Sequence, residues 1–325
     1  MLNAALHGLG RWGNRLTDSV KASSKIRIVK GVSRDPSRHA EFTQKYGAAV
    51  VADYAEVLRD PQIPAVVLAT PHTQHHAQII AAAQAGKHVF VEKPLTLKRV
   101  HAEEAVEACR KAGVTLGIGF NRRHAPAFVE MRRRIAAGDI GQVLHVEANF
   151  SGPSGWQLKP GAWRASRAES PAGGMTPRGV HTLDAMIQLA GPVAEVCAHS
   201  SRRALAADIE VDDTTAMLFR FANGATGQLT TITVTGELWR VHVFGSKGWL
   251  EMRGDTGLEF LGNDGKGERL ALPAVDKEQL TLEAFADAVA AGRPCIVPPE
   301  EAINGVAALE AIIASAESGK PVIVR

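Results

Sequence analysis

The sequence has few cysteines, few aromatic residues and no excess of either charge. Only three of its 325 residues are cysteines, and no two of them form a C-x-x-C pair. We therefore expect neither a disulfide framework nor a cysteine zinc site, and we expect a reducing, cytoplasmic environment. The formal net charge is only +3. Nucleic-acid-binding domains usually carry a strong basic excess, so we expect no nucleic-acid partner.

Long apolar runs are also missing. No stretch approaches the roughly 18 apolar residues that a membrane-spanning helix needs, so we expect no membrane partner. The first residues lack the basic segment and apolar run of a secretory signal, which again favours the cytoplasm. Hydrophobic residues make up 45% of the chain and charged residues 22%, which is ordinary for a globular protein. The length suits two domains.

Tyrosine is the scarcest residue of all. Only Tyr46 and Tyr54 occur, and neither starts a Tyr-x-x-x-Lys motif. This absence excludes the short-chain dehydrogenase mechanism, in which a tyrosine moves the proton. It also means that no tyrosine in the second half of the chain can act as an acid.

Short apolar runs alternate with helix-like segments in the first part of the chain. The apolar runs lie at 3–7, 26–32, 48–51, 65–69, 88–91 and 114–119. The helix-like segments lie at about 11–22, 36–46, 54–59, 72–85 and 97–112. This alternation predicts a doubly wound parallel sheet with helices on both faces, in a domain that spans residues 1–122.

The pattern changes near residue 123, where a basic helix is expected at about 125–137. Longer alternating runs follow, at 143–151, 193–200, 214–221, 227–234, 241–244 and 249–252. Helices are expected at 181–190, 278–291 and 299–318. Alternating runs separated by turns predict a large, open and mostly antiparallel sheet. The second domain, residues 123–325, is therefore expected to be of the α+β class.

A glycine-rich turn follows the first apolar run. Gly8, Gly10 and Gly13 form G-x-G-x-x-G between a predicted strand and a predicted helix, with Arg11 and Trp12 inside the motif. In dinucleotide-binding domains the first glycine permits the turn, the second lets the backbone approach a pyrophosphate, and the third lets helix and strand pack closely. We expect these five residues to bind the cofactor. The alternative is a turn with only a structural role.

The end of the second predicted strand bears on which cofactor binds. An acid usually stands there and bonds the ribose 2′-hydroxyl of NAD, but this chain has Ser33. Arg34 follows directly and Arg38 lies one turn further on, and an arginine can pair with a 2′-phosphate. The segment therefore favours NADP. NAD remains possible if Asp35 reaches back to the ribose or Arg34 lies in solvent.

The run 88–91 ends in Glu92-Lys93-Pro94. Ligands of open parallel sheets lie beyond the carboxyl ends of the strands, so this position favours a place for Lys93 beside the nicotinamide. The alternative is a solvated lysine at a strand end.

Several further motifs accompany these two. They are Thr70-Pro71-His72-Thr73-Gln74-His75, Ala85-Gly86-Lys87-His88-Val89, Gly119-Phe120-Asn121-Arg122-Arg123, Trp163-Arg164, Gly173-Gly174 and Gly179-Val180-His181-Thr182-Leu183-Asp184. Taken together, the motifs resemble those of the Gfo/Idh/MocA family of oxidoreductases over nearly the whole chain.

The resemblance implies a Rossmann domain, a second domain with an open sheet, a nicotinamide cofactor and a sugar, cyclitol or other polyol-like substrate. Lys93 and His181 match the family's catalytic lysine and histidine, and a cis proline peptide is expected in the Glu92–Lys93–Pro94 segment. Thr70, Pro71, His75 and Glu92 are expected near the cofactor. The residues expected to contact substrate are Lys93, Asn121, Arg123, Trp163, Arg164, His181 and Asp184. The implied reaction is hydride transfer between NADP(H), or NAD(H), and a CH–OH carbon.

One position departs from the family pattern. The family often has D-x-G-x-H before and at the histidine, but here the segment reads Pro177-Arg178-Gly179-Val180-His181. Proline can neither accept nor hold a proton, so the usual acid is missing. Asp184 lies three residues after His181, on the same face of a helix. It is expected to orient the imidazole or to bind a substrate hydroxyl.

Two other functions stay open: an NAD-assisted glycosidase of the same family, and a non-catalytic dinucleotide-sensing regulator, which Pro177 makes plausible. We expect no metal site at His72, His75 and His76, because no carboxylate or cysteine stands nearby at ligand spacing. Apolar residues on both faces of the runs 214–221 and 227–234 indicate a homodimer or homotetramer that pairs through this sheet.

Overall fold

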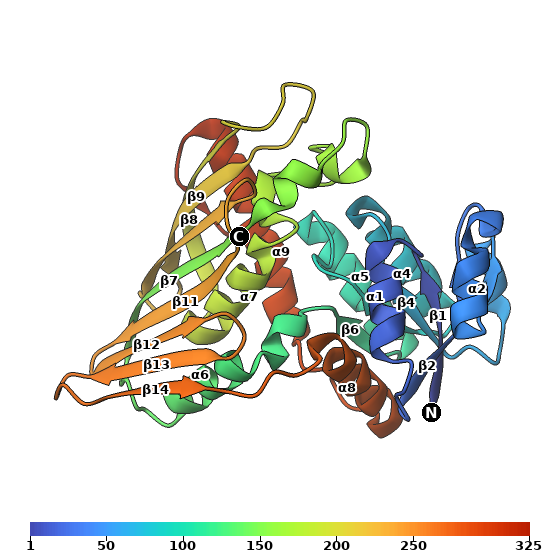
Figure 1. The fold of residues 1–325 in the computed structure, drawn as a ribbon, viewed down its shortest axis with the longest axis horizontal. Coiled ribbons are helices and arrows are strands. Elements are labelled where there is room, and N and C mark those ends of the chain that lie inside the picture. Colours follow the sequence, from blue (N-terminus) through green and yellow to red (C-terminus); the bar gives the residue numbers. More distant parts are fainter. The chain divides into compact units, whose positions relative to one another are not determined.

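A computed structural model describes all 325 residues, and the chain divides into two compact units (Figure 1). The first unit comprises residues 1–121 and 276–299, and the second comprises residues 122–275 and 300–325. The sequence suggested a single boundary near residue 122 and did not anticipate that the chain returns to the first unit. The division of roles between the two parts stays a prediction.

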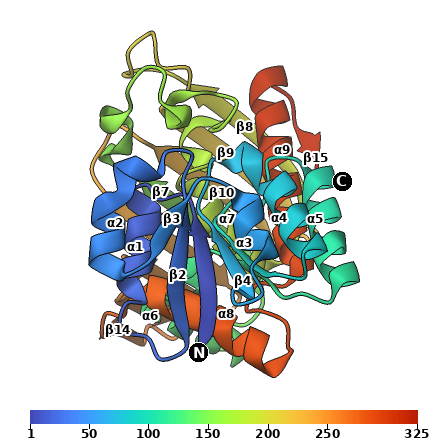
Figure 2. The ribbon, with the colours of Figure 1, turned by 90° about the vertical axis from the view of Figure 1, so that its right-hand side faces the viewer.

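The first unit contains the predicted parallel sheet. Its strands are β1 (Leu2–His7), β2 (Ile26–Val32), β3 (Ala49–Val51), β4 (Ala65–Leu68), β5 (His88–Val91) and β6 (Leu116–Ile118). They are ordered β3-β2-β1-β4-β5-β6, and every neighbouring pair is parallel. β1, β2 and β4 lie side by side in Figure 2. This is the Rossmann order, in which the direction of winding reverses between β1 and β4 and opens a ligand site at their carboxyl ends.

Helices join these strands. They are α1 (Arg11–Ser19), α2 (Ala40–Tyr46), α3 (Tyr54–Arg59), α4 (His75–Gln84) and α5 (Arg99–Ala112). β4 is buried along its whole length, as expected of a strand with helices on both faces.

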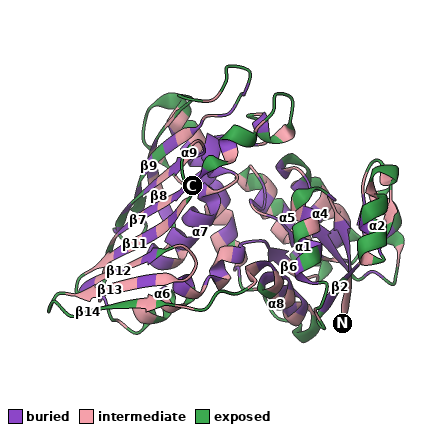
Figure 3. Ribbon diagram, viewed as in Figure 1, coloured by how far each residue is buried: buried purple, intermediate pink, exposed green.

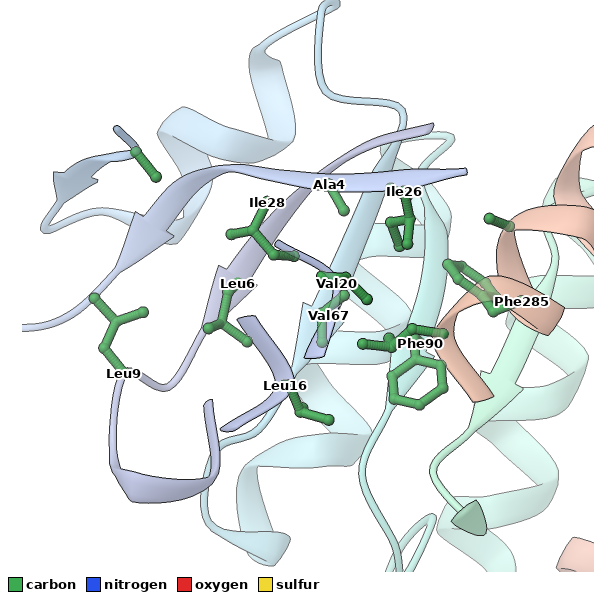
Figure 4. Close-up of a cluster of buried hydrophobic side chains, with 14 of the residues drawn as sticks. Ala4, Leu6, Leu9, Leu16, Val20, Ile26, Ile28, Val67, Phe90 and Phe285 are labelled. Atoms are coloured by element: carbon green, nitrogen blue, oxygen red, sulfur yellow. The ribbon is translucent and has the colours of Figure 1, made fainter. Parts of the chain in front are cut away.

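One helix of the first unit comes from much later in the chain. It is α8 (Lys277–Ala291), and its Phe285 packs edge-on against Phe90 of β5 with ring centroids 5.7 Å apart (Figure 4). Both rings are buried in the same apolar cluster as Leu6 and Ile26. The core of the Rossmann unit is therefore complete only when α8 is in place.

The second unit contains a sheet of nine strands. They are β7 (Val143–Ser151), β8 (Val193–Ser201), β9 (Thr214–Phe221), β10 (Thr226–Ile232), β11 (Leu238–Gly245), β12 (Gly248–Arg253), β13 (Gly257–Gly262), β14 (Gly267–Ala271) and β15 (Val322–Ile323). Their order is β14-β13-β12-β11-β7-β10-β9-β8-β15, and only β7 and β10 pair in parallel. The prediction of a mostly antiparallel sheet is confirmed. The sequence did not indicate β13 to β15.

Helices of the second unit cover one face of this sheet. α7 (Gly179–Ala190) packs against β7 and β10, and it is buried nearly all round (Figure 3). α6 (Pro126–Ala136) packs against β12 and β13, and α9 (Pro299–Ser318) is the longest helix of the unit. On β9, Met217, Phe219 and Phe221 are buried, while Leu218 between them is 61% exposed. None of the helices combines the length and the apolar character needed to cross a membrane.

The position of Phe285 yields a test of how the first unit is completed. Phe285→Ala should lower the free energy of unfolding by about 3–5 kcal/mol, because it removes a buried ring and leaves a cavity. Leu280→Ala on the same helix should lower it by no more than about 1 kcal/mol, because Leu280 is 38% exposed. Urea unfolding of both variants makes the comparison. Equal effects would contradict a core role for α8.

Candidate dinucleotide and substrate sites

The turn after β1 has no room for side chains at two of its glycines. Gly8 has φ +106°, and a Cβ atom there would lie 2.5 Å from the carbonyl oxygen of Ala69. A Cβ atom at Gly13 would lie 2.1 Å from the carbonyl oxygen of Gly8. The turn is therefore pressed against the end of β4, at the point where the strand order reverses.

Gly10 differs from these two glycines, because a Cβ atom added there would have no neighbouring atom within 4 Å. It precedes α1, whose first turn has no acidic residue and whose N-cap makes no side-chain hydrogen bond. The N–H groups at this helix end are thus left for an anion, and the helix dipole favours one. Arg11 is exposed there, whereas Trp12 packs against the apolar core. These features fit the pyrophosphate of a dinucleotide.

The segment after β2 is anchored by its backbone. The Ser33 N–H donates to the carbonyl of Val51 over 3.0 Å, and the Arg34 side chain is exposed. Asp35 accepts a 2.5 Å hydrogen bond from the Ser37 hydroxyl and lies 4.0 Å from Nε of Arg38, which is exposed. The Asp35 carboxylate is therefore already occupied by Ser37 and Arg38 of its own segment.

A buried histidine joins the loops that follow β4 and β5. Nδ1 of His75 lies 3.0 Å from the carbonyl oxygen of Pro94, and Nε2 lies 3.1 Å from that of Thr70. The Thr70 hydroxyl donates to Gln78 over 2.6 Å, and Pro71 leads into a short 3₁₀ turn. The predicted cofactor residues at the ends of these two strands are therefore held together in one framework.

The Lys93–Pro94 peptide is cis, as the resemblance implied. The preceding Glu92 is buried, and its carboxyl fills the space beside Gly119, where a Cβ atom would lie only 2.7 Å from Oε1. Burial raises the pKa of Glu92 to about 7, although the charge of Lys93 acts in the opposite direction. A carboxyl that titrates near neutrality thus lies directly beside the candidate catalytic lysine.

Asn121 is held by a partner from α8. Its Nδ2 donates to Oε1 of Glu278 over 3.0 Å, and Oε2 of Glu278 accepts a 2.9 Å bond from Arg15 of α1. The Asn121 amide oxygen is buried and makes no hydrogen bond, so it is available to a ligand. Glu278 was not predicted as a site residue, because no pattern in a single sequence shows that residues so far apart meet.

In the second unit, His181 lies in the first turn of α7 and is buried. Its ring lies 6.2 Å from that of Phe150, centroid to centroid. Two guanidinium groups lie close to the same Phe150 ring, Arg122 at 4.8 Å and Arg178 at 4.9 Å from its centroid. None of these three neighbours was predicted as a site residue, although Arg122 lies between the predicted residues Asn121 and Arg123 and Arg178 lies beside Pro177.

Arg123 and Asp184 form a buried ion pair. Nε of Arg123 donates to one carboxylate oxygen over 3.0 Å and Nη2 to the other over 2.5 Å. Arg123 also bonds Glu301 at 2.6 Å, and Asp184 accepts a 3.1 Å bond from Gln188. Burial raises the pKa of Asp184, against the effect of Arg123. Both carboxylate oxygens of Asp184 already accept hydrogen bonds. A substrate group that contacts Asp184 would therefore share these oxygens with Arg123.

The remaining predicted residues lie on the segment between β7 and α7. Trp163 and Arg164 belong to a short 3₁₀ turn, and the Arg164 guanidinium lies 4.0 Å from the centroid of the Trp163 ring. No group of three His, Cys, Asp or Glu side chains is arranged to hold a metal ion.

Two family models match the chain, one to each part. A model described as "Oxidoreductase family, NAD-binding Rossmann fold" matches residues 2–120, and the "GFO/IDH/MocA C-terminal domain" matches residues 128–251. Myo-inositol 2-dehydrogenase from Thermotoga maritima is 31% identical over 254 residues, which make up 74% of this chain and 72% of that protein. The chain belongs to the Gfo/Idh/MocA family of oxidoreductases.

Two further Gfo/Idh/MocA-like proteins define the extent of the similarity. The NAD(+) scyllo-inositol 2-dehydrogenase of Bacillus subtilis is 37% identical over 151 residues, 44% of this chain but only 43% of that protein. A solved structure from Desulfitobacterium hafniense, described as a candidate NADPH-dependent oxidoreductase, has a TM-score of 0.92 at 26% identity and covers 99% of this chain and 97% of its own. The resemblance inferred from the motifs is confirmed, and the model described as an NAD-binding Rossmann fold covers nearly all of residues 1–121 of the first unit.

Glu92 makes the stability of this Gfo/Idh/MocA protein depend on pH. Between its ordinary pKa of 4.5 and its raised value of about 7, the folded protein keeps a proton that the unfolded chain releases. The free energy of unfolding should therefore fall as pH rises through this window.

The variant Glu92→Gln should lose that part of the pH dependence. Urea unfolding at pH 5 and pH 8 measures it, with the exposed Glu41→Gln as a control that keeps the native dependence. If the Glu92 variant has the same pH dependence as the native protein, Glu92 is not the titrating group.

Proposed function

We propose that this chain is a dehydrogenase or reductase that transfers a hydride between a nicotinamide cofactor and a CH–OH carbon of a sugar, cyclitol or other polyol-like substrate. The observation that carries the proposal is the open phosphate turn at Gly10 in a chain that also has Lys93 and His181 at the family's positions. Two inositol dehydrogenases among the relatives support a cyclitol-like substrate.

The nicotinamide, when bound, donates or accepts the hydride. The ammonium of Lys93 hydrogen-bonds the reacting oxygen of the substrate and stabilises negative charge that develops there. The imidazole of His181 takes the hydroxyl proton during oxidation and returns it during reduction, because imidazole titrates near neutral pH. Polar contacts with the rest of the substrate are assigned to Asn121, Arg123, Trp163, Arg164 and Asp184.

Pro177 favours a second candidate, a dinucleotide-sensing regulator without catalysis, because it removes the acid that the family often has. The presence of both Lys93 and His181 argues against it, since a sensor needs neither. A screen of polyols with both cofactors separates the two functions: turnover of any of them excludes the regulator.

We assign NADP(H) as the preferred cofactor. Arg34 is exposed next to Ser33, and the carboxylate of Asp35 is bonded to Ser37. The similar proteins divide on this point, since one is named for NAD(+) and another is described as NADPH-dependent.

Arg34→Ala tests the cofactor assignment. It should weaken NADPH binding by about 1–3 kcal/mol, the range of a charge-assisted contact, and leave NADH binding almost unchanged. Arg27→Ala is the control, because it removes an exposed arginine at the opposite end of β2. Dissociation constants from fluorescence titration decide the matter. Tighter binding of NADH than of NADPH by the native protein would overturn the assignment.

The catalytic roles can be tested by substitution. Lys93→Ala and His181→Ala should each lower turnover about 10²–10⁴-fold, the usual effect of losing a positioned acid or base. Both variants should still bind the cofactor, because the phosphate turn is untouched. The exposed Lys111→Ala on α5 is expected to keep native turnover. Full turnover in the His181 variant would show that the proton moves through another group.

We further propose a cytoplasmic homodimer or homotetramer that pairs through the outer face of the second unit's sheet. His242 packs there against Phe244 at 4.0 Å and Trp249 at 4.9 Å between ring centroids, and Leu218 is 61% exposed. The same face also carries the ion pairs of Arg240 with Glu147 and of Arg220 with Glu195, and apolar side chains together with charged ones are typical of interfaces between protein chains. The cysteines, which are all free, fit a reducing compartment.

Sedimentation equilibrium at micromolar concentration should therefore give twice or four times the 34.6 kDa of one chain. A mass of one chain would exclude the homo-oligomer. Leu218→Glu should shift the distribution towards the single chain, since it places a charge on the proposed interface.

A further inference from the structure

Arg178 occupies a constrained position at the end of β7. Its Nη1 donates to the carbonyl oxygen of Ser151 over 3.2 Å, and its Nε lies 3.3 Å from the hydroxyl of Ser154. The guanidinium also lies 4.9 Å from the centroid of the Phe150 ring. The side chain is only 17% exposed, so its position is set by contacts on several sides.

Arg178 also binds a carboxylate, and the neighbouring glycine leaves room for it. Nη1 lies 2.7 Å from Oε1 of Glu237. A Cβ atom at Gly152 would lie 2.6 Å from Nη1 of Arg178 and 2.4 Å from Oε2 of Glu237. Any other residue at 152 would therefore crowd the space in which the guanidinium and the carboxylate meet.

The two partners differ in how firmly they are held. Glu237 lies between β10 and β11 and is 58% exposed, against 17% for Arg178. An exposed carboxylate regains water when it leaves, so the release of Glu237 from the ion pair costs little free energy. The guanidinium stays in place through Ser151 and Phe150. Arg178 is thus a fixed cation with an exchangeable carboxylate partner.

The surroundings of Arg178 favour an anion. Pro177 puts an uncharged residue where the family often has an acid, and the first turn of α7 contains no acidic residue and no side-chain cap. Arg122, which is itself paired with Asp255 at 2.5 Å, lies on the same Phe150 ring, and that ring is the neighbour of His181. The cationic position and the proposed base therefore border one aromatic side chain.

We propose that Arg178 binds a carboxylate of the substrate in place of Glu237, so that the substrate is a sugar acid or related hydroxy acid and not a neutral polyol. This inference rests on the proposed oxidoreductase function and narrows its substrate class. The loss of the acid at position 177 and the presence of Arg178 are then two parts of one change in specificity.

The alternative is that Arg178 and Glu237 form a latch that only holds two loops together. The two ideas give opposite results for Glu237. If Glu237 competes with the substrate, Glu237→Gln should increase kcat/KM for an acidic substrate or leave it unchanged. If the pair is a latch, loss of either partner should lower activity alike.

The experiment uses pairs of substrates that differ only in the acid group, such as D-glucose with D-glucuronate and D-glucitol with D-gluconate. The full-length protein with its cofactor should prefer the acid of the pair that it turns over. Arg178→Gln should lower kcat/KM for that acid roughly 10–100-fold, the effect of one charged hydrogen bond, mainly through KM. The neutral member should be unaffected. Arg110→Gln, which breaks an exposed Arg–Glu pair on α5, is the control.

Three results would overturn the inference: a native preference for the neutral members, an equal loss on both members in Arg178→Gln, or a loss on the acid in Glu237→Gln. Calorimetry with the same sugars on the NADPH-bound protein gives an independent answer. If no sugar is oxidised or reduced but the acids bind and Arg178→Gln abolishes binding, the proposed function fails and the anion site stands. If neutral sugars turn over and the acids do not bind, the function stands and the anion site fails.

Discussion

The close approach of the turn after β1 to the end of β4 is the constraint on which the first unit depends. Gly8 lies so near the Ala69 carbonyl, and Gly13 so near the Gly8 carbonyl, that neither position admits a single additional carbon. This contact fixes the start of α1 over the edge of the sheet. The N–H groups of that helix end, left without acidic or capping side chains, then face the space beside Gly10, which is open. Backbone packing alone thus provides the open helix end on which the proposed phosphate site depends.

The second unit positions its polar groups differently, through arginines that are each matched with carboxylates. Arg123 is buried between Asp184 and Glu301, whereas Arg178 is paired with a carboxylate that faces water. Removing one partner of a buried pair is costly, but an exposed partner exchanges easily. The buried ion pairs of Arg123 therefore suit a structural role. The ion pair of Arg178 suits exchange of its carboxylate partner for a ligand. Both lie close to α7, the helix that carries His181.

The sequence predicted what depends on local pattern. Apolar runs that alternate with helical segments were enough to predict the parallel sheet, and runs with alternating apolar residues were enough for most of the second sheet. The family could be inferred only from all the motifs taken together, from the glycine-rich turn to the His181 segment. The strand β14 was not predicted because its sequence, Gly267–Ala271, has too few apolar residues to alternate. Contacts such as Asn121 with Glu278 could not be predicted either. They join residues far apart in the chain, and a single sequence has no signal for such pairs.

The return of α8 to the Rossmann sheet has a consequence for how the protein is made. A ribosome releases the strands of the first unit early, but Phe285 follows only after almost the whole chain has been synthesised. Until then, the strands of the nascent first unit expose the apolar surface that α8 covers in the folded protein. Most of the second unit is already synthesised and available to fold at that stage. The first unit is therefore completed late, whereas the N-terminal domain of a multidomain chain usually folds first during synthesis. Recombination that exchanges the first 122 residues between relatives would separate the sheet from a helix that has adapted to it.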